Sequence, residues 1–141
     1  MESNNKTIIT VQCTIPATID LVWECWTAPK HIIHWNHASP DWHTPRAEND
    51  LRAGGKFLSR MEAKDGSFGF DFSGVYDEIL TMELINYTAD DGRKVIIRFV
   101  ATDEGILITE SFEAEGENPV ELQRAGWQSI MDNFKNYVES L

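Results

Sequence analysis

Basic residues are scarce in this chain. Its 141 residues include 12 Lys and Arg against 23 Asp and Glu, which gives a formal net charge of −11. Phosphate backbones and anionic membrane surfaces repel such a chain on average, and no cluster of Lys and Arg offers either of them a local patch. We therefore expect no nucleic-acid partner, and we interpret the dispersed acidity as a solubility feature.

Long apolar runs are also missing, and cysteine is rare. Nothing in the sequence is apolar over the length of a membrane span, and only the short polar stretch 1–6 precedes the first predicted strand. The two cysteines, Cys13 and Cys25, are isolated and follow no secretory signal. These features predict a cytoplasmic protein without membrane insertion, whose thiols are reduced and buried.

The motifs of several enzyme classes are absent. The sequence contains no GxSxG, HExxH, GxGxxG or Walker loop, and Gly54-Gly55 precedes a strand as an ordinary turn. Neither cysteine lies in a basic helix-start setting that would activate a thiol. We expect no cofactor, and these absences give no support to a nucleotide-binding site or a serine nucleophile.

Aromatic residues, in contrast, are abundant. Hydrophobic residues make up 42% of the chain, with five Trp, seven Phe and three Tyr. This is enough to build a sizeable core for one domain, predicted to span residues 1–141. Aromatic side chains line ligand pockets as well as cores.

The N-terminal third predicts one strand followed by two short helices. Residues 7–14 alternate and are rich in β-branched side chains, and Pro16 ends this strand. Thr18 is a suitable cap for a first helix, and Pro29 breaks it or begins a second one. Turn-forming residues predict an irregular segment over 36–54 that contains Trp42. The first helix carries an apolar stripe of Ile19, Val22, Trp23 and Trp26, and the second carries Ile32, Ile33 and Trp35.

The rest of the chain predicts a meander and then a long helix. Strands are expected over 56–62, in a long run that contains Phe68, Phe70 and Phe72, over 83–88 and in two further runs. Turns are expected at Asp65-Gly66, Asp91-Gly92 and Glu104-Gly105. Gly74 is placed to let a long strand bend. For the last helix Asn118 is a cap candidate, Pro119 suits the first turn and Glu121 completes a capping box. Its apolar face comprises Trp127, Ile130, Phe134 and Val138, flanked by Met131 and Tyr137, and its polar face comprises Gln123, Arg124, Asp132 and Lys135.

This order predicts an α+β fold. A curved antiparallel sheet of about six strands has one face to bury, and the C-terminal helix is the long amphipathic element that can cover it. The gap between sheet and helix is then the natural place for a ligand.

The N-terminal residues resemble a known family. Ile15, Ala17, Asp20, Val22-Trp23-Glu24, Thr27, Pro29, Ile32 and Trp35 match the signature of homologues of the activator of the heat-shock protein 90 ATPase, within the START-like (SRPBCC, Bet v 1-like) superfamily. The resemblance implies a helix-grip fold, in which the sheet wraps around the last helix. Thr18 and Ile19 depart from it, because the family often has prolines there.

Further residues resemble a bacterial, polyketide cyclase-like subgroup of that family. They are Asp41-Trp42, Pro45, Ala47, Asn49-Asp50-Leu51-Arg52, Gly54-Gly55, Gly74, Tyr76, Glu78 and Gly126-Trp127. The superfamily includes lipid carriers, cyclases, hydrolytic enzymes, resistance proteins and cochaperone domains. The resemblance therefore specifies the fold far better than the function.

All four histidines fall within residues 31–43. His31 and His34 are one helical turn apart, a spacing that can hold a metal, but no second ligand cluster accompanies them, so we expect no metal site. We expect His37 and His43, with Asp41, to provide polar groups at a pocket rim.

Acid–base chemistry has only scattered candidates. Tyr76, Tyr87, His37, Asp41 and Arg98 could supply polar groups to a cyclase, although each also has an ordinary structural interpretation. Arg98 alternates with apolar neighbours and is expected to point outward. Glu48 and Asp50 lie in an acidic segment and are expected to be solvated.

The aromatic pattern predicts the pocket itself. Trp35 and Trp42 are expected at its mouth, where a Trp ring suits a flat or lipid-like ligand. The predicted lining comprises Trp35, Trp42, Phe57, Met61, Phe70, Phe72, Tyr76, Tyr87, Phe99, Trp127 and Met131. Phe68 is expected to share a strand face with Phe70 and Phe72.

Three functions fit these expectations. The first is a module that binds a small hydrophobic or aromatic molecule, lipid-like or polyketide-like. The second is a cyclase or hydrolase that uses the same cavity. The third, ranked last, is a cochaperone-like activator that docks on a heat-shock protein 90 type ATPase. The sequence is compatible with a monomer or a weak homodimer, since an exposed strand edge could pair two copies.

Overall fold

The structure, a computed structural model, describes residues 7–141. These residues form one antiparallel sheet and three helices. The short polar stretch 1–6 lies outside the described residues. In chain order the elements are β1 (Ile8–Ile15), α1 (Ile19–Thr27), α2 (Pro29–Trp35), β2 (Trp42–Asn49), β3 (Lys56–Ala63), β4 (Gly69–Leu80), β5 (Leu84–Ala89), β6 (Lys94–Thr102), β7 (Gly105–Glu113) and α3 (Val120–Glu139).

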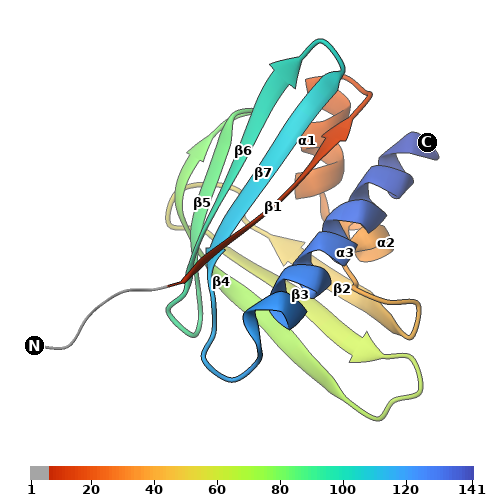
Figure 1. Cartoon of the computed structure of the whole chain (residues 1–141), viewed down its shortest axis with the longest axis vertical. Helices are drawn as coiled ribbons and strands as arrows, with labels where there is room; N and C mark the ends of the chain where they lie inside the picture. Colours follow the sequence, from red (N-terminus) through yellow and green to blue (C-terminus); the bar gives the residue numbers. More distant parts are fainter. Residues whose placement is uncertain (1–6) are drawn as a thin grey trace, which may run out of the picture.

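The sheet curls around the C-terminal helix (Figure 1). Its strand order is β1-β7-β6-β5-β4-β3-β2, and every neighbouring pair is antiparallel. Helix α3 lies in the hollow of the sheet and contacts β1, while α1 and α2 contact α3. This is the predicted α+β helix-grip arrangement. Within residues 7–141 no helix combines the length and apolarity needed to cross a membrane.

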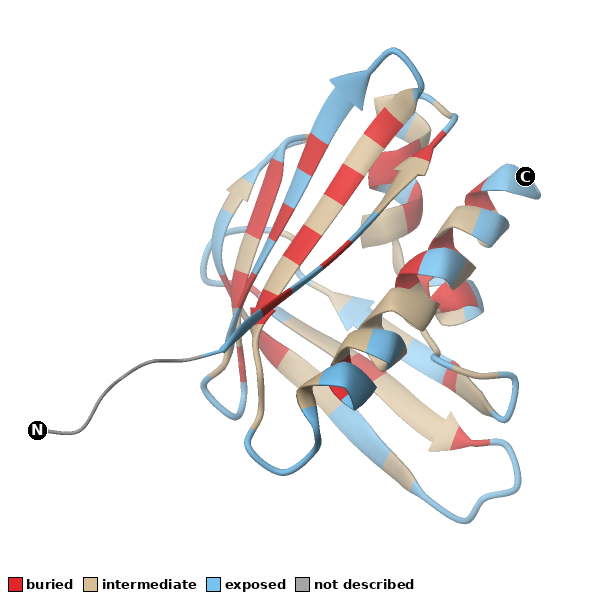
Figure 2. Cartoon of the chain, viewed as in Figure 1, coloured by how far each residue is buried: buried red, intermediate tan, exposed pale blue. Residues whose placement is uncertain are grey.

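Alternation along the strands builds the core. In β7 every second residue from Ile106 to Phe112 is buried, and Figure 2 shows this as regular banding of the strand. In β6 the predicted inward residues, Val95, Ile97 and Phe99, are all buried. One face of the sheet therefore supplies the apolar wall on which α1 and α3 pack.

Gly74 of β4 lies where neighbouring strands leave no room for a side chain. A Cβ atom on Gly74 would lie 2.4 Å from the Thr88 carbonyl oxygen of β5 and 3.0 Å from the Phe57 ring. Only a glycine permits this close approach of β4 to its neighbours. Two residues later the pairing of β4 with β5 shifts register, between Tyr76 and Glu78, and such a bulge bends a strand and increases its twist.

The sheet has seven strands, not about six. The extra strand is β2, within the segment expected to be irregular. The strand was not predicted because it contains Pro45. This proline lies where the pairing of β2 with β3 shifts register, between His43 and Arg46, and β2 is an edge strand of the sheet. Proline is tolerated at bulges and on edge strands because it need not donate to the ladder.

The two short helices begin as expected and are tied together by a tryptophan. The Thr18 hydroxyl oxygen caps α1 by accepting a hydrogen bond from the Leu21 amide, at 3.3 Å. Pro29 occupies the first turn of α2. The Trp35 indole N–H at the end of α2 donates to the Cys25 carbonyl oxygen of α1, at 2.9 Å. This bond fixes the angle between the helices and places Trp35 at the cavity.

The start of α3 differs from the prediction. Pro119 is the N-cap residue, no side chain caps the helix, and Asn118 instead bonds to Glu115, so neither the Asn118 cap nor the Glu121 capping box forms. Gln123 was expected on the polar face but is buried. Its side-chain amide bonds to the Glu115 amide and carbonyl and to the Asn118 carbonyl. A polar side chain can be buried here because it satisfies the turn that precedes the helix.

Candidate functional site

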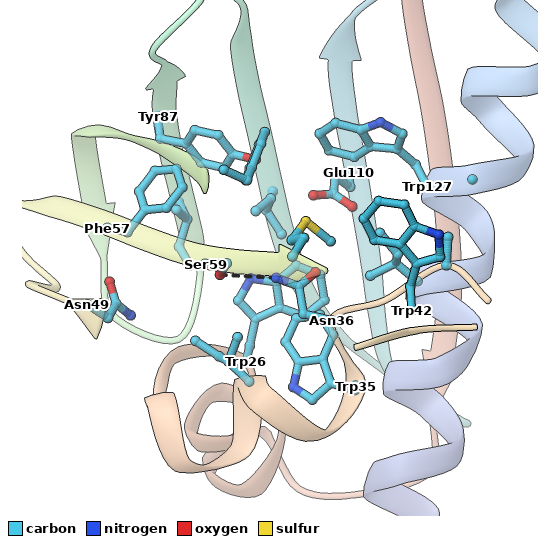
Figure 3. A pocket seen from close by; sticks show the side chains of 18 of the residues that line it. Trp26, Trp35, Asn36, Trp42, Asn49, Phe57, Ser59, Tyr87, Glu110 and Trp127 are labelled. Carbon is cyan, nitrogen blue, oxygen red and sulfur yellow. Dashed lines mark hydrogen bonds between the residues drawn. The ribbon is translucent and has the colours of Figure 1, made fainter. Parts of the chain in front are cut away.

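A cavity of about 470 Å³ lies between the concave face of the sheet, the N-terminal helices and α3 (Figure 3). Its walls come from β2 to β7, from α1, α2 and the loop after α2, and from the middle of α3. The lining is mostly apolar, and one side opens to solvent. Such a concave, largely apolar space with a few polar groups is the usual form of a small-molecule site.

Aromatic rings form the wall that the sheet contributes. The Phe57 ring of β3 is 4.7 Å from the Tyr87 ring of β5 and 5.2 Å from the Tyr76 ring of β4, centroid to centroid. Phe72 of β4 contacts Tyr87 edge-on and reaches Trp127 of α3 at 6.3 Å. Because these rings support one another, the wall is rigid and offers flat apolar surfaces to a ligand.

Two tryptophans form the helix side of the cavity. The Trp26 ring of α1 is 5.0 Å from the Trp35 ring of α2, and both meet Phe134 of α3 edge-on at 4.9 and 4.8 Å. Trp26 and Trp35 also line the cavity, whereas Phe134 is fully buried behind them. The three helices thus meet in an aromatic cluster that holds this side in place.

The mouth carries an exposed aromatic cluster. Trp42 at the start of β2 lies 5.9 Å from the Phe68 ring and 6.1 Å from the Phe70 ring. Phe68 precedes β4 and is 61% exposed, and Phe70 is 40% exposed. Phe70 and Phe72 both face the cavity, as alternation on one strand face predicts, and Phe68, just before β4, contacts Phe70 and Trp42. Trp42 and Phe70 line the cavity, and Phe68 does not.

Two hydrogen-bond networks fix polar residues of the lining. The Asn36 side-chain amide donates to the Ser59 hydroxyl at 3.1 Å, which joins the loop after α2 to β3 (Figure 3). The Tyr76 hydroxyl donates to the Asn49 side-chain oxygen at 2.5 Å, and the Asn49 amide donates to the Thr27 carbonyl at 2.6 Å. These polar atoms are occupied by the protein itself, so their first role is to position the walls.

Glu110 is the most unusual group in the cavity. It lies on β7, lines the cavity and is only 7% exposed. Figure 3 shows its carboxyl group between Tyr87 and Trp127, directed into the cavity. Burial raises the pKa of this carboxyl from 4.5 to about 8, since ionisation is unfavourable away from water. At neutral pH the group is therefore mostly protonated and can both donate and accept a hydrogen bond.

Tyr87 presents a second buried polar group. It lines the cavity from β5 and is 7% exposed. Burial, followed by the proximity of Glu110 and Tyr76, raises the pKa of its hydroxyl well above the ordinary value. The hydroxyl thus stays protonated at neutral pH. Within residues 7–141 no hydrogen bond joins the Tyr87 hydroxyl or the Glu110 carboxyl to another protein group, and both face the open cavity.

The structure brings most of the predicted lining together. Phe99 and Met131 do not line the cavity, because both are buried in the core, where the Phe99 ring meets the Trp23 and Trp26 rings edge-on. The residues that do line it are Trp35, Trp42, Phe57, Met61, Phe70, Phe72, Tyr76, Tyr87 and Trp127. Whether these nine contact a ligand stays a prediction.

The three predicted rim residues lie beside the cavity and do not line it. The His43 ring faces Glu62 on the neighbouring strand at 3.7 Å. The Asp41 carbonyl accepts from the Lys64 amide, and the His37 carbonyl accepts from the Asn133 side chain. The loop lines the cavity through their neighbours Asn36, Ala38, Ser39 and Trp42.

The other two histidines face a different surface. The His31 ring bonds the Tyr137 hydroxyl at 2.6 Å and the Glu24 carboxylate at 3.1 Å, and the His34 ring stacks on the Tyr137 ring. Within residues 7–141 no group of three or more potential ligands is arranged to hold a metal ion.

Glu110 was not among the predicted site residues, although the sequence contains a signal for it. Ile106, Ile108 and Phe112 alternate on β7, and Glu110 occupies the inward position between Ile108 and Phe112. A charged residue at a position where the alternation predicts a buried apolar one is expected to direct its polar group into the interior. Other overlooked lining residues, among them Trp26, Ile32, Asn36, Asn49, Ser59, Ile85, Ile97 and Ile130, are ordinary core or loop residues by pattern.

Comparison with solved structures places the fold among bacterial proteins. The chain is similar to the solution structure of an AHSA1-like protein from Aeromonas hydrophila, with 42% identity and a TM-score of 0.90 over 95% of this chain and 93% of that one. A solution structure from Cytophaga hutchinsonii shares 51% identity, with a TM-score of 0.80 over 97% and 94% of the two chains. No curated protein matches the chain.

The family model provides the assignment. The model described as "Activator of Hsp90 ATPase homolog 1-like protein" matches residues 16–139. This range includes α1, α2, β2 to β7 and α3, that is, every element that lines the cavity. The chain belongs to the family of Activator of Hsp90 ATPase homolog 1-like proteins, an SRPBCC family whose fold is typical of hydrophobic-ligand-binding proteins.

Proposed function

We propose that this protein binds a small hydrophobic or aromatic molecule in the cavity between the sheet and α3. The observation that carries the proposal is the cavity itself, about 470 Å³ in volume and walled by aromatic rings from both sheet and helices. This volume falls in the range of about 300–1,000 Å³ that is usual for small-molecule sites. Burying an apolar ligand there would be favoured by about 25 cal/mol for each Å² removed from water.

The mouth supports the same function. Trp42 and Phe70 are partly exposed and continue the aromatic lining outward. Large apolar side chains exposed together usually mark a place where something apolar binds. An apolar ligand could thus reach the cavity along a continuous aromatic surface.

An enzyme of the polyketide cyclase or hydrolase type remains a prediction, and the geometry favours it less. Of its five candidate residues, His37 and Asp41 do not line the cavity and Arg98 is exposed on β6. The Tyr76 hydroxyl is engaged by Asn49. Tyr87 alone among these candidates has a free polar group in the cavity.

Cochaperone activity, cytoplasmic location and a monomeric or weakly dimeric state also remain predictions. The first rests on the family description alone. Titrating the protein into a heat-shock protein 90 ATPase assay would test it, and an unchanged ATPase rate would dispose of it.

Native mass spectrometry of gently purified protein, combined with solvent extraction, tests the proposed function. We expect a co-purifying apolar molecule of defined mass, or, if the protein is isolated empty, a thermal shift with naphthalene as probe, since a ligand that binds the folded state stabilises it. An empty protein whose melting temperature is unmoved by saturating naphthalene would contradict the proposal.

A further inference from the structure

Two polar groups face the apolar cavity without a hydrogen-bond partner in the described part of the chain. They are the Glu110 carboxyl of β7 and the Tyr87 hydroxyl of β5, both on residues that are 7% exposed. Buried polar atoms in native proteins are nearly always hydrogen-bonded, and leaving one unpaired costs about 1–3 kcal/mol. Both groups line an open cavity, where water can reach them. A ligand that fills the cavity displaces that water, so it must offer each group a hydrogen bond or leave it unpaired at this cost.

The sheet register places the two groups on the same wall. Glu110 lies opposite Ile97 of β6, and Ile97 lies opposite Ile85 of β5. Tyr87 follows Ile85 by two residues, so its side chain is on the same face of the sheet. Figure 3 shows the Tyr87 and Glu110 side chains both entering the cavity, with Trp127 beyond Glu110. Apolar surfaces of Ile85, Ile97 and Trp127 surround them.

Among residues 7–141 no cation pairs with Glu110. Arg93 also lines the cavity, but its guanidinium is held by the Asp91 carboxylate at 2.7 Å. Glu48 lines the cavity from β2 and pairs with Arg46 at 2.9 Å. Two other groups are close enough to interact with Glu110. They are the Tyr87 hydroxyl and, from β1, the Cys13 thiol, and burial raises the pKa of both. Burial alone accounts for the raised pKa of Glu110, so the carboxyl is neutral when the cavity is empty at pH 7.

We propose that Glu110 and Tyr87 together recognise a hydroxyl or carbonyl oxygen on an otherwise apolar, uncharged ligand. This inference rests on the proposed function and specifies its ligand class. The protonated carboxyl donates to the ligand oxygen, and the Tyr87 hydroxyl provides a second hydrogen bond to it or to its proton. The aromatic walls hold the apolar remainder of the molecule.

A matched pair of probes tests the inference. Naphthalene and 2-naphthol differ by one hydroxyl group, and fluorescence or calorimetric titration gives the dissociation constant of each at pH 6.5. We expect wild-type protein to bind 2-naphthol about tenfold more tightly than naphthalene, as one buried hydrogen bond predicts. Glu110→Leu should abolish this preference while still binding naphthalene. Glu110→Gln, which also donates and accepts without a charge, should retain most of it, and Tyr87→Phe should reduce it.

The outcomes separate this inference from the proposed function. Equal affinity of the wild-type protein for both probes would overturn the inference and leave apolar binding intact, whereas binding of neither would overturn both. A lipophilic cation, 1-naphthylmethylammonium, tests the alternative that Glu110 is ionised and binds a positively charged ligand. If it bound more tightly than 2-naphthol and lost its affinity in Glu110→Gln, the buried carboxyl would be a counter-ion and the uncharged ligand class would be wrong. Should Glu110→Leu fail to fold, Glu110→Gln and Tyr87→Phe still decide the question.

Discussion

The Trp127 indole of α3 lies flat on the Phe112 ring of β7, with 3.8 Å between centroids and 15° between ring planes. Phe112 is fully buried, and Glu110 is the next inward-facing residue along the same strand. The stack therefore joins the helix to the sheet immediately beside the unpaired carboxyl. This contact helps to set the width of the cavity at its most polar point.

Trp127→Ala should both loosen the fold and enlarge the cavity. Removing the ring deletes the stack on Phe112 and the contact with Phe72, so we expect the free energy of unfolding to fall by about 3 kcal/mol. Trp127→Phe preserves an aromatic contact and should cost less than about 1.5 kcal/mol. Urea denaturation measures the free energy of unfolding of both variants. An equal loss in Trp127→Ala and Trp127→Phe would show that aromatic stacking is not the stabilising contact.

Gly126 offers a way to fill the cavity from α3. It lines the cavity, and a Cβ atom there would meet no described atom within 4 Å apart from its chain neighbours and the adjacent backbone of α3. Gly126→Ala should stabilise the helix by about 1 kcal/mol, since glycine is a poor interior helix residue. Gly126→Leu should extend into the ligand space and weaken naphthalene binding at least tenfold.

Ala125→Leu is the matched control for Gly126→Leu. Ala125 is the preceding residue of α3, is exposed and does not line the cavity. Its substitution should leave naphthalene affinity unchanged within about twofold. If Ala125→Leu and Gly126→Leu weakened binding equally, the ligand would not occupy this cavity.

Substitutions of Phe70 and Phe68 test whether an exposed phenylalanine contributes to ligand binding only when it lines the cavity. Both are exposed and both contact Trp42, but only Phe70 lines the cavity. Phe70→Ser should weaken naphthalene binding about three- to tenfold, whereas Phe68→Ser should leave it nearly unchanged. Each should alter stability by less than about 1 kcal/mol, because exposed positions contribute little. A stronger effect from Phe68→Ser would place the ligand outside the mouth.

Glu110 should make stability depend on pH. Between its ordinary pKa of 4.5 and its folded pKa of about 8, the folded chain holds a proton that the unfolded chain has lost. The stabilising effect of that proton is complete below about pH 4.5 and is lost as the pH rises through about 8. From pH 5 to pH 9 the loss should amount to about 3–5 kcal/mol.

Glu110→Gln provides the comparison for that prediction. The Gln side chain is neutral at every pH, so the variant should unfold like wild type at pH 5 and be more stable than wild type at pH 9. Other titrating groups are common to both proteins and cancel in the difference. Burial raises the pKa of the Tyr87 hydroxyl and the Cys13 thiol, the two groups that interact with Glu110, so both keep their protons up to pH 9. A constant difference between the two proteins from pH 5 to pH 9 would mean that Glu110 titrates normally.

Periodicity predicted the sheet well because the strands bury one face. The alternating residues of β6 and β7 and the apolar stripe of α1 lie where the pattern placed them. Turn chemistry located the hairpins β3–β4, β5–β6 and β6–β7, whereas the turn between β4 and β5, at residues 81–83, contains no Gly, Pro, Asn or Asp and was not predicted. Strand β2 escaped prediction because a proline at a bulge on an edge strand resembles a loop in sequence. The cap of α3 was not predicted because Asn118 bonds to a competing local partner, Glu115, three residues earlier in the chain.

The candidate site was predicted less completely, for a physical reason. Aromatic pattern identifies which side chains face inward but does not separate a cavity wall from solid core. Phe99 and Phe72 have the same pattern, and Phe72 lines the cavity while Phe99 packs against tryptophans. The separation depends on where α3 crosses the sheet, which no local pattern encodes. Glu110, by contrast, was readable as a carboxyl in an inward register position.

The most direct test is ligand mapping by NMR spectroscopy, for which a chain of 16.1 kDa is well suited. Titrating ¹⁵N-labelled protein with naphthalene should shift the amide and indole signals of the lining, above all Ser59, Tyr87, Glu110, Gly126 and the Trp127 side chain. The outer face of the sheet, with Ile8, Ile96 and Val100, should remain unperturbed and serves as the internal reference. Shifts confined to that outer face, or to Phe68 alone, would contradict a ligand-binding cavity.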